Sequence, residues 1–188
     1  MEILQYTEDH QNFRERLRRF LEKEVTPHAG QWEKDGIVPK EAWKKMGRAG
    51  FLCTEVLPDY GGIGGDFLYS VIVTEEISRT YQNGLVASLH SDIVVPYITA
   101  FGSDKIKKKY LPGCVSGVII SAVAMTDPDA GSDLAGINTS AVEEGDEVIL
   151  NGSKTFISNG IIADLVVLAA REPVVEDQYQ AISLYLVE

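Results

Sequence analysis

The most informative stretch of the sequence is residues 123–136, which read VAMTDPDAGSDLAG. It begins with apolar residues typical of a strand and continues into small, hydroxylated and acidic residues that favour a tight turn. Consecutive backbone N–H groups in such a turn can form a concavity that binds anions. Gly131 allows a ligand to approach the backbone closely, and Thr126 and Ser132 offer hydroxyl donors. A plain loop between two strands accounts for the same residues equally well, so the pattern alone leaves both interpretations open.

The residues before this stretch show the spacing of helices. Thr7 is predicted to cap an amphipathic helix, because apolar residues then recur every three or four positions until Pro27 ends the pattern. A second helix is predicted from Pro39 to about Arg48, since proline suits the first turn of a helix.

Three further helices are predicted in the same half of the chain. Asp66 is a typical cap for the first of them. The next covers residues 85–100, where Pro96 either kinks the helix or marks its true start. Ser103 caps a short basic helix, which Pro112 is expected to end.

The remainder of the chain has the composition of short strands. Strands are predicted at residues 119–124, 139–142, 147–150, 154–158, 165–170 and 182–187. Gly145-Asp146 and Asn151-Gly152 both predict hairpin turns, because these residues tolerate positive φ. Helices followed by strands indicate a multidomain α+β fold: an all-α domain over residues 1–118, then an incomplete antiparallel β-domain over residues 119–188.

Composition restricts the function classes. The chain has 188 residues, with 17 Lys and Arg against 28 Asp and Glu, which gives a net charge of −11. This balance argues against nucleic acid and anionic membranes as partners. No apolar run reaches the roughly 20 residues of a membrane span, and residues 1–5 lack a secretory signal core. Cys53 and Cys114 form no CxxC motif, so a reduced, cytoplasmic location is expected.

Several patterns that suggest known sites fail on inspection. The cluster Gly61-Gly62-Ile63-Gly64-Gly65 does not satisfy the dinucleotide motif GxGxxG, so a tight structural loop is favoured. His90-Ser91-Asp92 contains the residue types of a hydrolytic triad, but adjacent residues on a helix point in different directions. The three histidines have no metal-ligand spacing, so no metal site is expected.

Four segments resemble one known family. Residues 124–133 (AMTDPDAGSD) resemble the flavin-wrapping signature of the acyl-CoA dehydrogenases, and residues 154–160 (KTFISNG) resemble that family's second flavin-contacting strand. Residues 58–66 (PDYGGIGGD) and 74–79 (TEEISR) resemble its glycine-rich loop and the helix that follows. The resemblance covers essentially the whole chain and is closest to long-chain-type members.

The resemblance implies FAD as the cofactor. The Met125 backbone and the Thr126 hydroxyl would address the pyrimidine side of the isoalloxazine, while Gly131 and Ser132 would lie near the pyrophosphate. Phe156 would pack against the flavin, and Ser158 would hydrogen-bond near N5. The residues expected to contact FAD are Val123, Met125, Thr126, Gly131, Ser132, Phe156, Ile157 and Ser158.

The same resemblance implies the reaction. A glutamate base removes the α-proton of a fatty acyl-CoA while hydride passes from Cβ to flavin N5, which yields a trans-2-enoyl-CoA in fatty acid β-oxidation. Ser132, Ser91 and Val95 are expected to contact the acyl-CoA. Electron-transfer flavoprotein would accept the electrons, and the complete enzyme would be a homotetramer. A processed eukaryotic form would lie in the mitochondrial matrix.

The sequence departs from the family pattern in places. Asp127 stands where Glu is usual, Asp129 where Gly is common, and Phe156 replaces a frequent Trp. The family's base lies in a C-terminal helical domain expected beyond Glu188, so no residue here is assigned as catalytic. Glu75 and Glu76 are not favoured, because carboxylates on a helix surface are usually solvated.

Two alternatives stay open at this point. The chain could be a truncated, non-catalytic paralogue that binds CoA esters or a partner protein. It could also be another flavoenzyme of the superfamily, such as an acyl-CoA oxidase. A chain without the base is expected to be inactive by itself.

Overall fold

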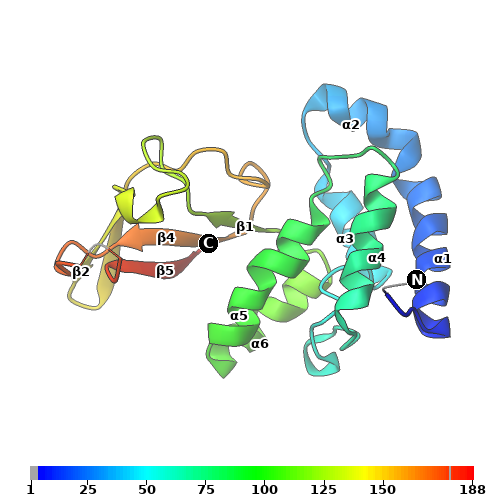
Figure 1. The fold of residues 1–188 in the computed structure, drawn as a ribbon, viewed down its shortest axis with the longest axis horizontal. Helices are drawn as coiled ribbons and strands as arrows, with labels where there is room; N and C mark the ends of the chain where they lie inside the picture. Colours follow the sequence, from blue (N-terminus) through cyan, green and yellow to red (C-terminus); the bar gives the residue numbers. More distant parts are fainter. Residues whose placement is uncertain (1–3, 178) are drawn as a thin grey trace. The chain divides into compact units, whose positions relative to one another are not determined.

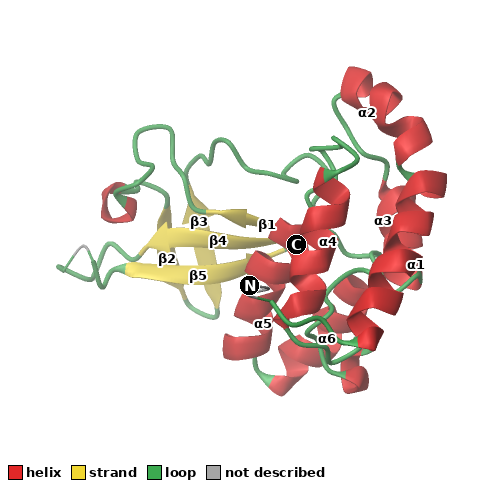
Figure 2. Cartoon of the chain, turned by 45° about the vertical axis from the view of Figure 1, so that its right-hand side comes forward, coloured by secondary structure: helices red, strands yellow, loops and turns green. Residues whose placement is uncertain are grey.

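The computed structural model describes residues 4–177 and 179–188. The chain divides into two compact units, Met1–Ile120 and Ser121–Glu188. Helices form the first unit and strands dominate the second (Figures 1 and 2), which confirms the predicted order of a helical domain and a β-domain. Residues 1–3, on which the expected lack of a secretory signal partly rests, lie outside the described residues. Within the described residues, no helix is long and apolar enough to cross a membrane.

The first helix begins at its predicted cap. α1 (Glu8–Glu24) is preceded by Thr7, whose hydroxyl accepts the His10 N–H at 3.4 Å. The Thr7 N–H in turn donates to Nδ1 of His10 at 3.0 Å. The buried residues of α1 recur at three- and four-residue spacing: His10, Phe13, Leu17 and Leu21. This stripe is the apolar face that the sequence pattern predicts.

α4 (Phe67–Ser78) lies beside α1 (Figure 1). Its predicted cap, Asp66, accepts the Leu68 N–H at 3.0 Å through Oδ1. The same oxygen lies 3.0 Å from Nε2 of His10. Because Nδ1 of His10 accepts the Thr7 N–H, Nε2 is the donor to Asp66. His10 therefore joins the N-terminal ends of both helices.

Two short elements that the sequence did not predict follow α1. Pro27 ends α1 but lies in the first turn of η1 (Thr26–His28), a short 3₁₀ helix, because its fixed φ is compatible with a new helical start. α2 (Ala29–Asp35) continues directly from it. α3 (Lys40–Arg48) begins one residue after the predicted start, because Pro39 is its extended cap, and it buries Trp43 and Met46.

The glycine cluster belongs to the connection between α3 and α4. Its chain passes through η2 (Pro58–Tyr60) and turns at Gly61, where φ is +89°. A Cβ on Gly62 would lie 1.9 Å from the backbone oxygen of Val56, so only glycine fits. The prediction of a tight structural loop is confirmed.

α5 (Val95–Phe101) is preceded by a π-helical turn, η3 (Leu89–Val94). Pro96 lies in the first turn of α5, so it marks the start of a regular helix. Because the hydrogen-bond pattern changes at the widened turn before it, proline, which lacks a backbone N–H, fits at this position without breaking the helix.

α6 (Asp104–Val115) is capped by Ser103 as predicted, but the prediction that Pro112 ends it was wrong. Pro112 lies inside the helix, where it removes one backbone hydrogen bond. The helix continues because Leu111 and Cys114 are buried, and burial of apolar side chains outweighs that loss.

The second unit is one five-stranded sheet. Its strands are β1 (Ser121–Ala124), β2 (Ser140–Glu144), β3 (Glu147–Asn151), β4 (Leu165–Arg171) and β5 (Ile182–Val187). β4 is central: β1 pairs with it in parallel, β2 meets it in parallel at Arg171, and β5 pairs antiparallel along its other edge. The sheet is therefore mixed, where a purely antiparallel one was expected. The long connection between β1 and β4 provides the crossover that a parallel pair needs.

The two predicted hairpin turns had different outcomes. Gly145-Asp146 joins β2 to β3 in a two-residue turn, with Gly145 at φ +65°. Asn151-Gly152 forms no hairpin, and residues 154–158 form no strand, so both of those predictions were wrong. Gly152 is instead required by close packing, because a Cβ there would lie 2.5 Å from Oγ1 of Thr139. Phe156 takes φ +55°, which interrupts the extended backbone of a strand.

Candidate functional site

The loop that follows β1 is folded back onto the sheet. The Asp127 N–H donates to the Ala130 oxygen at 2.9 Å, and the Ala130 N–H donates to the Asp127 oxygen at 3.3 Å. Ala130 and Ile137 pack with Ala169 of β4 in one buried cluster. The tight turn that the sequence predicts is thereby fixed to the central strand.

Asp127 is the centre of this loop. Its carboxylate is 3% exposed and accepts four hydrogen bonds. The Asn138 and Thr139 N–H groups donate to Oδ2 at 2.7 Å, and the Thr139 hydroxyl donates to Oδ1 at 2.9 Å. Burial raises the pKa of Asp127, but the hydrogen bonds from Lys154 and Thr139 outweigh burial and hold the pKa below its ordinary value. The carboxylate is therefore a fixed anion and not a proton donor at neutral pH.

Lys154 connects this loop to the segment after β3. Its Nζ donates to Oδ1 of Asp127 at 2.6 Å and to the Met125 oxygen at 2.8 Å. The next residue, Thr155, donates its N–H to the Thr126 oxygen at 3.0 Å. Segments that are about 30 residues apart in sequence are thus held together at the end of β1.

Phe156 follows these contacts and projects from them. It is 93% exposed and has φ +55°, which is uncommon for a residue with a Cβ. The turn after it is fixed, because the Gly160 N–H donates to the Ile157 oxygen at 3.0 Å and the Asn159 amide donates to the Ser121 oxygen at 3.2 Å. A strained and exposed aromatic ring on a rigid turn points to contact with a ligand or partner.

The residues expected to contact FAD fall into three groups. Val123 lies on β1, and Met125 and Thr126 follow at its end, where Lys154 and Thr155 hold them. Phe156, Ile157 and Ser158 continue from that anchor. Gly131 and Ser132 are exposed and directly follow the turn closed by Asp127 and Ala130. Within the described residues, no hydrogen bond joins Ser132 to either of the other groups.

Polar donors in this region are left available. Among the described residues, the hydroxyls of Thr126 and Ser132 have no hydrogen-bond partner, and neither do the backbone N–H groups of Thr126 and Ser132. Together with the exposed ring of Phe156, these groups match what a flavin nucleotide requires: flat apolar packing and a few fixed donors.

Ser91 and Val95 line one cavity in the helical unit. The cavity has a volume of about 330 Å³ and is lined by apolar side chains, including Val56, Pro96 and Leu111, together with the charged residues Glu55 and Lys107. The Ser91 hydroxyl accepts the Cys53 N–H at 2.9 Å, which fixes the π-helical turn η3 against the buried residues that follow α3. The two expected substrate-contacting residues of this unit are thus brought together.

The triad residue types at 90–92 do not form a triad. His90 is fully buried, and its Nε2 lies 3.4 Å from Sγ of Cys53 and 3.1 Å from the Cys114 oxygen. Burial lowers the pKa of His90 to about 4. Asp92 instead accepts the Ser70 hydroxyl at 2.7 Å. The side chains therefore serve separate partners, as their positions on a helix predict. No cluster of metal-ligating side chains occurs in the described part of the chain.

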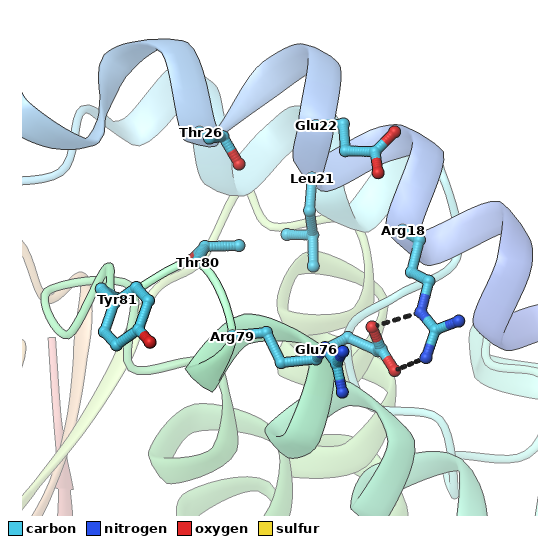
Figure 3. Close-up of a pocket in the computed structure, with 8 residues that line it drawn as sticks. All are labelled: Arg18, Leu21, Glu22, Thr26, Glu76, Arg79, Thr80 and Tyr81. Atoms are coloured by element: carbon cyan, nitrogen blue, oxygen red, sulfur yellow. Dashed lines mark hydrogen bonds and ion pairs between the residues drawn. The ribbon is translucent and has the colours of Figure 1, made fainter.

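A second cavity lies between α1 and the end of α4 and contains none of the expected site residues (Figure 3). Its volume is about 440 Å³, and Arg18 and Glu76 lie on its wall. Glu76 is only 2% exposed, so the expectation of a solvated carboxylate was wrong. Arg18 binds it through Nε at 2.7 Å and Nη2 at 2.9 Å, and Arg14 donates at 2.7 Å. Burial raises the pKa of Glu76, but the hydrogen bonds from Arg18 and Arg14 outweigh burial and hold the pKa below its ordinary value, so Glu76 stays ionised and paired.

Sequence reasoning missed the residues that hold the site together. In the sequence, Asp127 stands out only as a departure from a family pattern, and Lys154 only as part of a motif. One signal was present: Lys154 is the sole Lys or Arg between Tyr110 and Arg171, in a stretch that contains many acids. A lone cation there suggests a specific partner.

Known protein families match both units. The model of the acyl-CoA dehydrogenase N-terminal domain matches residues 7–118, and the model of the acyl-CoA dehydrogenase middle domain matches residues 122–188. The long-chain specific acyl-CoA dehydrogenase, mitochondrial, of Sus scrofa is 45% identical over 186 residues, which cover 97% of this chain and 43% of the relative.

Solved structures agree with these matches. A crystal structure of an acyl-CoA dehydrogenase from Geobacillus kaustophilus has a TM-score of 0.95 and 50% identity, and the match covers 100% of this chain and 49% of that chain. A glutaryl-CoA dehydrogenase from Mycobacterium smegmatis in complex with FADH2 has a TM-score of 0.87 and 27% identity, with 97% and 46% covered. The chain spans a little under half the length of these relatives.

Proposed function

Because the chain belongs to the acyl-CoA dehydrogenase family, we propose that it forms the first part of an FAD-dependent dehydrogenase that acts on a long-chain acyl-CoA. The observation that carries this proposal is the contact between two segments at the end of β1, residues 125–126 and residues 154–155. There Lys154 and Thr155 bind the Met125 and Thr126 oxygens and leave donors and the Phe156 ring exposed.

The side chains and backbone donors in and beside these two segments have the chemistry needed to bind FAD. Thr126 and Ser132 hold hydroxyl and N–H donors that have no partner in the part of the chain that the structure describes, and such donors suit the polar edge of a flavin and a pyrophosphate. Phe156 supplies an apolar face at little cost in backbone conformational entropy, since its backbone is already fixed on a rigid turn. Bound FAD would accept the hydride that leaves Cβ of the acyl chain.

The substrate would bind partly in the helical unit. The cavity lined by Ser91 and Val95 is apolar along Val56, Pro96 and Leu111, which suits a hydrocarbon chain. Ser132 would contact the CoA ester. Two relatives that are 45% and 44% identical to this chain are named as long-chain specific, and this supports the choice of chain length.

No carboxylate described here is proposed as the base. Glu76 is bound by two arginines and Asp127 by Lys154, so both pKa values are lowered and neither group is poised to take a proton. The family's glutamate base is expected beyond Glu188. Electron-transfer flavoprotein is the proposed electron acceptor, and a homotetramer the proposed assembly of the complete enzyme.

Anaerobic titration of the purified protein tests this function. The product of the complete reading frame is expected to be yellow and to lose its flavin absorbance on addition of a long-chain acyl-CoA. A short-chain acyl-CoA at the same concentration serves as the matched control and should bleach it less. Colourless protein that takes up no FAD would contradict the proposal. Protein that binds FAD but is not bleached would instead favour the non-catalytic alternative.

A further inference from the structure

In the peptide group between Met125 and Thr126, the carbonyl oxygen has a hydrogen-bond partner among the described residues and the N–H has none. Nζ of Lys154 donates to the Met125 oxygen at 2.8 Å. In a trans peptide the C=O of one residue and the N–H of the next point in opposite directions. The contact with Lys154 therefore turns the Thr126 N–H away from the lysine, and this N–H has no partner among the described residues.

The neighbouring peptide group is fixed as well. The Thr126 oxygen accepts the Thr155 N–H at 3.0 Å, and the Asp127 N–H donates to the Ala130 oxygen at 2.9 Å. Both ends of that peptide are therefore occupied. Across these two peptide groups, the Thr126 N–H is the one backbone donor left for a ligand in the described structure.

The ammonium group of Lys154 also acts through its charge. The Lys154 side chain is 8% exposed and that of Asp127 is 3% exposed, so the ion pair lies in a region where charges are weakly screened. A charged donor on a carbonyl oxygen polarises the whole peptide group and makes its N–H a stronger donor.

We propose that Lys154 is a positioning residue for the flavin: it orients and polarises the Met125–Thr126 peptide so that the Thr126 N–H donates to the pyrimidine ring of FAD. This inference rests on the proposed function. Lys154 itself does not contact the flavin. Asp127 has a different role, since it neutralises the buried ammonium and holds residues 138–139.

The consequence is a preference for one redox state. Reduction adds electron density to the pyrimidine ring, and a polarised donor binds a more negative acceptor more strongly. Loss of Lys154 should therefore weaken the binding of reduced FAD more than that of oxidised FAD. A lysine that served only to stabilise the loop would affect both redox states equally.

The test compares variants of the protein expressed from its complete reading frame. K154M removes the ammonium but leaves the Asp127 carboxylate buried without its cation, which destabilises the loop. The double variant D127N/K154M removes both charges and keeps two side chains of similar size. K154R keeps a charged donor. Lys108→Met, at an exposed position on α6, is the matched control.

The measurement is FAD affinity in both redox states, from binding titrations and the reduction potential of the bound flavin, with thermal unfolding of each variant without FAD. We expect D127N/K154M to lose about tenfold more affinity for reduced than for oxidised FAD, the effect of one charge-assisted hydrogen bond. K154R should recover most of this loss, and Lys108→Met should match the wild type.

The outcomes separate this inference from the function on which it rests. Wild-type protein that binds no FAD overturns both. Wild-type protein that binds FAD, with an unchanged affinity ratio in the folded double variant, overturns the role of Lys154 alone. Equal losses in both redox states assign Lys154 a structural role and also overturn the inference.

Discussion

Asp127 shows how one short carboxylate organises a loop. The family pattern has a glutamate at this position, yet the aspartate reaches the Asn138 and Thr139 N–H groups, the Thr139 hydroxyl and Lys154 at 2.6–2.9 Å. The missing methylene therefore leaves no donor unsatisfied. A buried carboxylate with four donors remains ionised, and this explains why Asp127 supports the site without taking part in proton transfer.

A substitution at Phe156 is expected to change FAD affinity without lowering the stability of the protein. Its side chain is 93% exposed and its φ is +55°, so Phe156→Gly removes little packing and relieves a conformation that costs about 1 kcal/mol. We expect the free energy of unfolding to stay unchanged or rise by up to about 1 kcal/mol, while FAD affinity falls. Urea unfolding and a fluorescence titration with FAD measure the two effects.

Tyr81 supplies the control for this prediction. It is 89% exposed with φ +58°, but it lies in the helical unit and is not among the expected flavin contacts. Tyr81→Gly should therefore shift stability in the same direction and leave FAD affinity unchanged. Equal FAD affinity in the wild type and in Phe156→Gly would argue against a flavin contact at this ring.

Ion pairs join α1 to α4, and of the two glutamates that take part, Glu76 is buried and Glu75 is exposed. Glu76 is 2% exposed and receives hydrogen bonds from Arg14 and Arg18, whereas Glu75 is paired with Arg14 at a position where its side chain is 47% exposed. Glu76→Gln should lower the free energy of unfolding by about 2 kcal/mol, because it removes two charge-assisted contacts in a desolvated place.

Glu75→Gln is the matched substitution on the same helix. An exposed pair contributes little, so we expect a loss of less than about 0.5 kcal/mol in urea unfolding. Similar losses in both variants would mean that burial does not strengthen the Glu76 contact.

The π-helical turn η3 contains His90, whose protonation favours the unfolded state. Burial lowers the pKa of His90 to about 4, and in the unfolded chain the ordinary value is 6.5. The unfolded state therefore binds the proton first. The stability that neutral His90 contributes is complete above pH 6.5 and is lost as the pH falls towards 4.

His90→Gln tests this effect. Between pH 7 and pH 5, the wild type should lose about 2 kcal/mol of unfolding free energy that the variant does not lose. Urea unfolding at the two pH values gives the difference directly. Parallel losses in the two proteins would show that His90 is protonated in the folded state.

Much of the chain's local structure was predictable from the sequence. Thr7, Asp66 and Ser103 cap helices as expected, and Gly145-Asp146 makes the expected hairpin, because these features depend on neighbouring residues only. The order of a helical domain and a β-domain follows from the change in hydrophobic spacing.

The rest depends on contacts between distant residues. Residues 154–158 have the composition of a strand, but Lys154 is drawn to Asp127 and Met125, 27 and 29 positions away, and Phe156 turns the chain. Pro112 remains helical because its neighbours are buried. The parallel pairing of β1 with β4 likewise depends on residues that are far apart in sequence. The expected FAD contacts came from the family resemblance, whereas the ion pair that anchors them became visible only in the structure.

At the scale of the whole molecule, the two units carry different parts of the proposed function. The helical unit contains an apolar cavity with Ser91 and Val95, and the β-unit presents the anchored donors and Phe156. The family relatives are about twice as long, so the complete reaction is proposed for the whole protein.

The most direct measurement is a crystal structure of the protein, expressed from its complete reading frame, with FAD bound. We expect the isoalloxazine to lie against Phe156, with its pyrimidine ring within hydrogen-bond distance of the Thr126 N–H and hydroxyl, and Lys154 to remain bound to the Met125 oxygen. FAD bound at a site that contacts neither Thr126 nor Phe156 would contradict the proposed flavin site.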